Sequence, residues 1–199
     1  MLAAVFTLLA QNSVALAQDI RLTALGDSLT QGYGLVPEQG LVPQLETWLR
    51  ARGHAVSVLN AGVSGDTTTG GLARLDWTLS DQPQAMIVAL GGNDLLRGID
   101  PALARANLDA ILTGATARGL PVLLVGMEAP GNYGPDYKAE FDAIYPDLAA
   151  QHGALLMPSF FGPLLADGGV DAVELLALVV ALIERLLVED RVQCDSGLA

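Results

Sequence analysis

The stretch "TALGDSLTQGYG", Thr23 to Gly34, places an apolar run directly before a polar turn that carries one serine, Ser28. An apolar run that stops at a glycine-containing turn is typical of a buried strand followed by a helix. Ser28 then stands at the junction, where its hydroxyl is clear of the sheet. Two interpretations of this serine are open: a catalytic nucleophile, or the N-cap residue of the helix.

The rest of the chain alternates short β-rich runs with helical segments, which predicts a parallel sheet covered on both faces. The expected strands are residues 20–25, 55–60, 85–90, 121–127 and 154–157. The expected helices are residues 40–52, 67–79, 101–118 and 136–151. No linker or repeat interrupts the pattern, so we predict one domain over residues 18–189.

The chain is acidic, and its composition limits the function classes. It has 199 residues, of which 51% are apolar, and a formal net charge of −12. Such a surface repels phosphate backbones and anionic lipid, so we expect no nucleic-acid partner and favour small neutral or cationic substrates. Cys194 is the only cysteine, which excludes an intramolecular disulfide. Its polar surroundings favour no structural role, although a free thiol or a dimer link is the alternative.

The first residues, "MLAAVFTLLAQNSVALAQ", contain an apolar stretch that is too short to span a bilayer. Ala15-Leu16-Ala17 has the small-x-small form of a secretory cleavage site. We therefore expect a signal peptide over residues 1–17, a mature chain that begins at Gln18, and a periplasmic or secreted protein without a stable membrane span. No Lys or Arg precedes the apolar part, so a structural helix in a cytoplasmic protein is the alternative.

Polar, glycine-rich segments follow four of the predicted strands. They read "GDSLTQGYG", "NAGVSGDTT", "GGNDLLRG" and "EAPGNYG". In open parallel sheets, ligands bind beyond the carboxyl ends of the strands. The four segments therefore predict one pocket, rich in backbone N–H groups, at a single edge of the sheet.

These segments belong to four longer blocks, "ALGDSLTQGYG", "NAGVSGDTTTGGLARL", "ALGGNDLLRG" and "APGNYGPDY", within residues 20–161. In order and spacing the blocks resemble the GDSL, or SGNH, hydrolase family, in particular its secreted arylesterases, acyl-thioesterases and lysophospholipases. The resemblance implies a flavodoxin-like three-layer α/β/α sandwich with a five-stranded parallel sheet. It also implies hydrolysis of a small-molecule ester or thioester by a monomer, without a metal or organic cofactor.

The resemblance assigns the catalytic roles. Ser28 corresponds to the nucleophile, and its N–H, the N–H of Gly65 and the side chain of Asn93 correspond to the oxyanion hole. A glycine lets the backbone approach the substrate, and an asparagine side chain donates without titrating near neutral pH. The alternatives are a simple turn glycine and an asparagine that caps a turn.

Three further residues are expected at the substrate site. Asp27 adjoins Ser28 and is interpreted as a hydrogen-bond acceptor that fixes the loop, not as a catalytic acid. Asn132 and Tyr133, after the fourth strand, are expected to line the acyl or alcohol pocket. Their alternative is that they are plain loop residues.

No proton acceptor for Ser28 is identified. In the family it is a histidine in an Asp-x-x-His block after the fifth strand, whereas this chain has only His54 and His152. Both precede predicted strands, and a five-residue strand separates them from Ser28 by roughly 15 Å or more. Hydrogen-bond reach is about 3 Å, so neither histidine is expected to act.

The segment where the family block is expected reads "LLADGGVDAVELLALVVALIERLL". Asp167-Gly168 resembles the start of the block, but no histidine follows, and the resemblance ends at Gly169. A shifted reading frame and a genuinely divergent end both account for this change. Asp171 or Glu174 is a weak substitute, because an ordinary carboxylate is a poor acceptor for a serine proton.

The sequence therefore predicts a serine ester hydrolase with a nucleophile and an oxyanion hole. Two alternatives remain beside it. One is a catalytically silent protein that binds esters or acyl groups, because the base is missing. The other is a product of an altered gene end whose fold is compromised.

Overall fold

The computed structural model describes residues 19–161, which contain a five-stranded parallel sheet of order β2-β1-β3-β4-β5. The strands are β1 (Ile20–Gly26), β2 (Val56–Gly62), β3 (Ala85–Ala89), β4 (Val122–Val125) and β5 (Leu155–Met157). Each boundary lies within two residues of the expected one. The predicted α/β fold with five parallel strands is confirmed.

The helices follow the expected pattern, with two divisions. They are α1 (Ser28–Gln31), α2 (Leu41–Ala51), α3 (Thr68–Ala73), α4 (Leu75–Leu79), α5 (Gly92–Leu96), α6 (Pro101–Thr116), α7 (Pro135–Asp142) and α8 (Ile144–His152), with 3-10 turns η1 (Pro37–Gln39) and η2 (Gly131–Tyr133). The segments expected as 67–79 and 136–151 are each split in two, at Arg74 and at Ala143. The helix expected directly after the first strand is present as the short α1, whereas α5 was not predicted, because five residues are too few to show a helical period.

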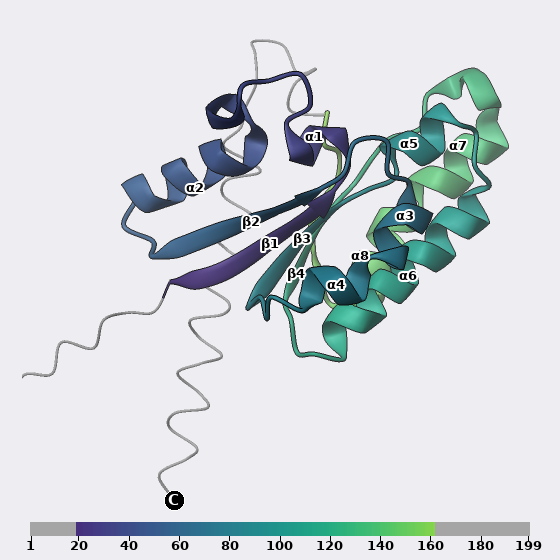
Figure 1. Ribbon diagram of the computed structural model, residues 1–199. Helices are drawn as coiled ribbons and strands as arrows, with labels where there is room; N and C mark the ends of the chain where they lie inside the picture. Colours follow the sequence, from purple (N-terminus) through teal and green to yellow (C-terminus); the bar gives the residue numbers. More distant parts are fainter. Residues whose placement is uncertain (1–18, 162–199) are drawn as a thin grey trace, which may run out of the picture.

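Helices cover both faces of the sheet (Figure 1). Helix α2 packs on one face, and α3, α4, α6 and α8 lie on the other. The central strand β3 divides its side chains between the two cores, because successive residues of a strand point to opposite faces. Met86 and Val88 join the core under α6 and α8, whereas Ile87 joins the core under α2.

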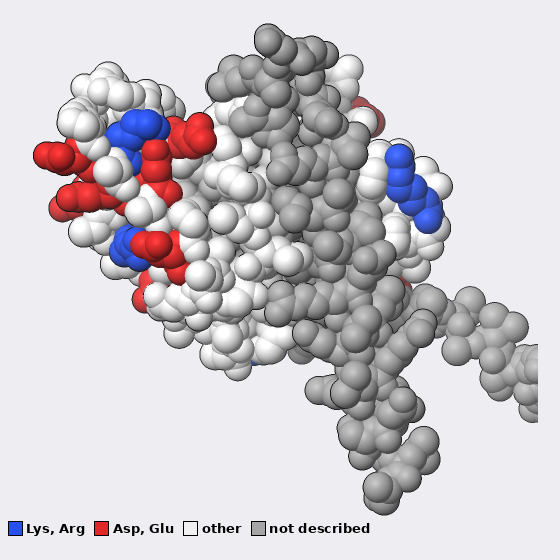
Figure 2. Space-filling model, turned by 180° about the vertical axis from the view of Figure 1, so that it is seen from behind, with Lys and Arg blue, Asp and Glu red and all other residues white. Residues whose placement is uncertain are grey.

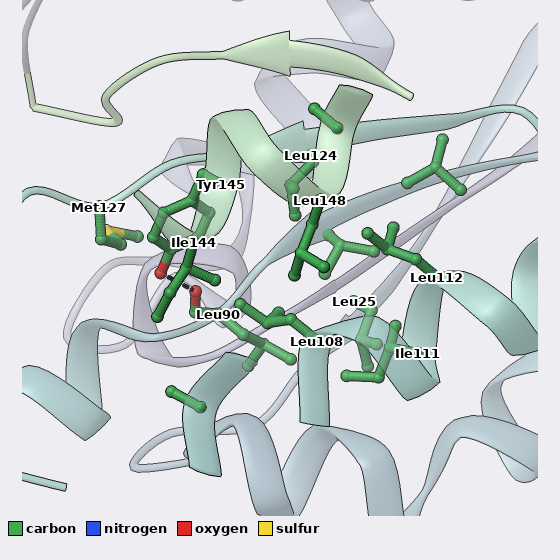
Figure 3. Packing of buried hydrophobic residues seen from close by; sticks show 14 of the residues in the cluster. Leu25, Leu90, Leu108, Ile111, Leu112, Leu124, Met127, Ile144, Tyr145 and Leu148 are labelled. Carbon is green, nitrogen blue, oxygen red and sulfur yellow. Dashed lines mark hydrogen bonds between the residues drawn. The ribbon is translucent and has the colours of Figure 1, made fainter. Parts of the chain in front are cut away.

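The core under α6 and α8 fixes the start of α5 (Figure 3). The Tyr145 hydroxyl donates to the Leu90 carbonyl over 2.9 Å, next to the leucine side chains of α6. The following residue, Gly91, has φ +115°, and an added Cβ would collide with that hydroxyl. A glycine is therefore needed here, and α5 begins directly after it.

The acidic character of the chain is visible on the surface. Seen from behind, Asp and Glu side chains gather at the edge where α7 and α8 lie (Figure 2). Exposed members of this group include Asp136, Glu140 and Asp147. None of the helices in residues 19–161 is long and apolar enough to cross a membrane.

Candidate active site

Ser28 is the first residue of α1, two positions beyond the end of β1. The N-cap of this helix is Asp27, whose Oδ1 accepts a hydrogen bond of 3.0 Å from the Leu29 N–H. The interpretation of Ser28 as the N-cap residue is therefore wrong, because Asp27 takes that position. Neither the Ser28 hydroxyl nor its N–H has a hydrogen-bond partner within residues 19–161, so both are available to a ligand.

Ser28 and Asn93 lie at the point where the strand order reverses. Strand β1 lies between β2 and β3, and the chain crosses from one side of β1 to the other between these two strands. Ligands of open parallel sheets bind in the crevice at this switch point. Ser28 follows β1 and Asn93 follows β3, so the sheet topology brings the two side chains to one crevice.

A pocket of about 480 Å³ opens beside Ser28. Five of the six residues predicted for the site lie in its wall: Asp27, Ser28, Asn93, Asn132 and Tyr133. The remainder of the wall was not predicted and consists of Leu29, Gly92, Leu95, Leu96, Met127, Glu128, Pro130 and Phe161. Most of these residues are apolar, as is usual for a small-molecule site.

Gly65 is not in the pocket wall but lies in a tight turn that Asn93 contacts. The turn is closed by a 3.1 Å hydrogen bond from the Asp66 N–H to the Val63 carbonyl. Gly65 has φ +82°, a conformation that favours glycine and accounts for the residue type without catalysis. Its N–H has no acceptor in the described part of the chain. Asn93 Nδ2 donates to the Asp66 carbonyl over 2.9 Å, which ties Asn93 to this turn.

Arg74 holds the same turn against the sheet. Its Nε donates to Asp66 Oδ2 over 2.6 Å, while Nη1 and Nη2 donate to the carbonyls of Ala61 and Gly26 over 2.7 and 2.9 Å. One guanidinium thus joins the carboxyl ends of β1 and β2 to the turn that contains Gly65. Sequence reasoning missed this residue, because no local pattern shows which groups an arginine reaches across the fold.

The Asn93 amide is engaged on both of its hydrogens. Besides the bond to Asp66, Nδ2 donates to Asp27 Oδ2 over 3.2 Å. Asp27 is only 2% exposed, and this burial raises the pKa of its carboxyl. Hydrogen bonds from Leu29 and Asn93 act in the opposite direction on that pKa. An oxyanion that binds Asn93 must therefore displace one of two existing acceptors, of which Asp27 is the more distant.

The neighbouring Asp94 is structural. It is fully buried, and its carboxylate accepts hydrogen bonds of 2.9 Å from the Thr68 N–H and 2.7 Å from the Thr68 hydroxyl. Asn107 of α6 donates to the same hydroxyl over 3.0 Å. This network fixes α5, and with it Asn93, against α3 and α6.

The loop after β4 is held by a lysine and a carboxylate. Lys138 Nζ donates to the Ala129 carbonyl over 2.8 Å, and Asp142 Oδ1 accepts the Ala129 N–H over 2.7 Å. Lys138 and Asp142 also pair with each other over 2.6 Å. Further along this loop, the ring of Tyr133 packs 4.9 Å from that of Tyr137. The wall that carries Asn132 and Tyr133 is thus anchored to α7.

Both histidines lie at the amino ends of the parallel strands, whereas Ser28 lies at their carboxyl ends. His54 precedes β2, and His152 ends α8 just before β5, where its Nε2 lies 2.6 Å from Asp109 Oδ1. The seven residues of β1 span about 20 Å between its amino end and Ser28. Neither histidine is in the pocket wall.

Several sequence-based predictions fall outside residues 19–161. They concern the cleavage site after Ala17, the substitute bases Asp171 and Glu174, and Cys194. Within the described residues, no group of three or more His, Cys, Asp or Glu is arranged to hold a metal ion.

The sequence profile of the GDSL-like lipase/acylhydrolase family matches residues 24–178, most of the chain. The chain belongs to this family. The match begins inside β1 and extends past Gly169, where the recognisable motifs stop. The predicted membership of the GDSL/SGNH family, and with it the function class of a serine ester hydrolase, is confirmed.

Known members of the family align over most of the chain. Esterase TesA of Pseudomonas aeruginosa is 41% identical over 74% of this chain and 77% of its own length. Thioesterase 1/protease 1/lysophospholipase L1 of Escherichia coli K12 is 40% identical over 70% of this chain and 66% of its own. The crystal structure of AlinE4, described as an SGNH-hydrolase family esterase, is 42% identical with a TM-score of 0.71, covering 87% of this chain and 97% of that one.

Proposed function

We propose that Ser28 attacks the carbonyl carbon of small acyl esters or thioesters bound in the 480 Å³ pocket. The observation that carries the proposal is the shared position of Ser28 and Asn93 in one pocket wall at the switch point of the sheet. The names of the relatives add the substrate classes to consider, which are aryl esters, thioesters and lysophospholipids.

In the proposed reaction Ser28 Oγ forms a bond to the carbonyl carbon while its hydroxyl proton passes to water. The bond to the alcohol or thiol then breaks, and the leaving group takes up a proton. Water attacks the acyl-serine in the second step, which releases the carboxylic acid and restores the hydroxyl. The sequence offers no histidine to accelerate the proton transfers at this edge, so each step relies on solvent.

The oxyanion is proposed to bind the N–H groups of Ser28 and Gly65 and the Asn93 amide. One such donor contributes about 3–4 kcal/mol of transition-state stabilisation in serine hydrolases. Asn93 would exchange its 3.2 Å bond to Asp27 for a bond to the substrate.

A second candidate function is binding of esters or acyl groups with little turnover. It is favoured by the Ser28 hydroxyl, which has no hydrogen-bond acceptor within residues 19–161. It is also favoured by the position of both histidines at the far edge of the sheet. The two candidates share one site and differ only in rate.

Intact mass after incubation with a fluorophosphonate tests the role of Ser28. We expect one adduct, located on the peptide that contains Ser28, and no adduct with Ser28→Ala. Ser64→Ala serves as the matched control, because Ser64 lies in the neighbouring turn outside the pocket wall. An adduct on another residue, or equal labelling of Ser28→Ala, would remove Ser28 from the proposed role.

We also propose that the chain is exported and cleaved after Ala17. The support is the small-x-small pattern of Ala15-Leu16-Ala17, since signal peptidases require small side chains at these two positions. N-terminal sequencing of exported protein is expected to begin at Gln18, and Ala15→Phe is expected to block that cleavage. Exported protein that still begins with Met1 would contradict the proposal.

A further inference from the structure

We propose that Glu128 makes the pocket prefer esters that carry a positive charge and disfavour esters that carry a negative one. The proposal rests on the proposed function, because it concerns the substrates of the Ser28 site. It goes further by naming the residue and the chemical class of substrate, namely an acyl or alcohol group with an ammonium centre.

The first argument is the charge of the pocket wall. Its described residues include two carboxyl groups, Asp27 and Glu128, and no lysine or arginine. Asp27 is buried and accepts hydrogen bonds from Leu29 and Asn93. Glu128 is exposed and has neither a hydrogen bond nor an ion pair within residues 19–161. Among residues 19–161, no basic side chain therefore compensates its negative charge in the pocket.

The second argument is that the basic side chains that contact the loops of the site bond to groups outside the pocket wall. Lys138 is held by Asp142 and a backbone carbonyl, and Arg74 is held by Asp66 and two carbonyls. Arg97 donates to the carbonyl of Gly65 over 2.9 Å. None of these three basic residues belongs to the pocket wall. Lys138 and Arg74 are therefore paired with carboxylates, and no basic side chain of the described residues lies in the pocket wall.

The third argument is the surroundings of Glu128. The next residue, Ala129, is bonded through both its N–H and its carbonyl to α7, so the backbone beside Glu128 is fixed. Tyr133 and Phe161 share the wall, and each is 41% exposed. Aromatic faces and a carboxylate together attract an ammonium group by cation–π and Coulomb interactions. A neutral ester gains nothing from the charge, and an anionic ester is repelled.

The test compares three phosphonate probes with the same leaving group and similar size. One carries a trimethylammonioethyl group, one the neutral 3,3-dimethylbutyl isostere, and one a carboxylate. The second-order rate constant for labelling of Ser28 is measured by intact mass at low ionic strength. We expect the cationic probe to react fastest and the anionic probe slowest, and we expect added salt to reduce the difference.

Glu128→Gln is expected to lower the ratio of cationic to neutral labelling by about three- to fivefold, the effect of an exposed ion pair. Asp81→Asn is the matched control, because Asp81 is exposed and precedes β3 at the opposite edge of the sheet. It removes the same net charge and is expected to leave the ratio unchanged. An equal fall in both variants, or a Glu128→Gln variant that slows all three probes alike, would overturn the proposal.

A second measurement separates this proposal from the proposed function. Calorimetry gives the equilibrium affinity of two unreactive methyl ketones, one with the trimethylammonioethyl group and one with its neutral isostere. If the probes do not label Ser28, the proposed nucleophile fails, while the calorimetric ratio still reports the charge preference. Equal affinities of the two ketones, or a ratio that Glu128→Gln does not lower, would overturn the role of Glu128.

Discussion

Residues 166–199 can be replaced with the C-terminal segment of a family member that carries the Asp-x-x-His block. We expect this replacement to raise the rate of aryl-ester hydrolysis by about 10²–10⁴-fold. That range is the usual contribution of a positioned general base. Ser28 already lies in the pocket wall, and its hydroxyl has no hydrogen-bond acceptor within residues 19–161, so we expect a positioned base to be the component that limits the rate. Initial rates at pH 8 measure the gain. The rate of the chimera is expected to fall below pH about 6.5, because a protonated histidine cannot accept the serine proton.

The control is the same chimera with alanine in place of the histidine of its new C-terminal segment. It keeps the new C-terminal segment and removes only the base. We expect the alanine version to return to the rate of the original chain. A gain that survives the alanine change would assign the effect to the segment and not to proton transfer. A folded chimera without any gain would show that another component is missing from the site.

Asn93→Ala is expected to weaken binding of a boronate that mimics the tetrahedral intermediate by about 10²–10³-fold, the usual effect of removing one oxyanion donor. The dissociation constant is measured by calorimetry. The substitution removes a side-chain donor from the pocket wall to which Ser28 also belongs. It leaves Ser28 and the apolar wall in place.

The same substitution also frees Asp27 and the carbonyl of Asp66, because Asn93 donates to both. The unfolding midpoint is therefore measured in parallel, and affinities are compared well below it. Ground-state affinity for a neutral ester or ketone should change much less than boronate affinity. An unchanged boronate affinity would remove Asn93 from the oxyanion hole.

The parts of this fold that the sequence predicts best are the strands and the loops after them. Buried parallel strands appear as short apolar runs, and polar residues placed directly after such runs must meet at one edge. This argument predicts that the segments with Ser28, Asn93 and Tyr133 meet, whereas the resemblance to the family supplied the roles of Ser28 and Asn93. All three residues lie in the pocket wall.

What the sequence does not predict are contacts between distant side chains and backbone groups. Arg74 bonds to the carbonyl of Gly26, 48 positions away, and no local pattern indicates that contact. Asp27 and Ser28 are both good N-cap residues and adjoin each other, so the sequence left a capping role open for Ser28 that Asp27 in fact fills. Glu128 follows a buried strand as Ser28 does, yet an exposed glutamate gives no signal until a pocket is seen around it.

The central claim is that Ser28 is placed for attack but lacks a base. The most direct test is the turnover of an activated aryl ester at pH 8 by the chain as it stands, compared with Ser28→Ala. We predict that the two rates differ by only a few-fold, because the oxyanion hole and the pocket remain in both. Turnover of the unaltered chain at an ordinary enzymatic rate of about 10 s⁻¹, abolished by Ser28→Ala, would contradict the claim.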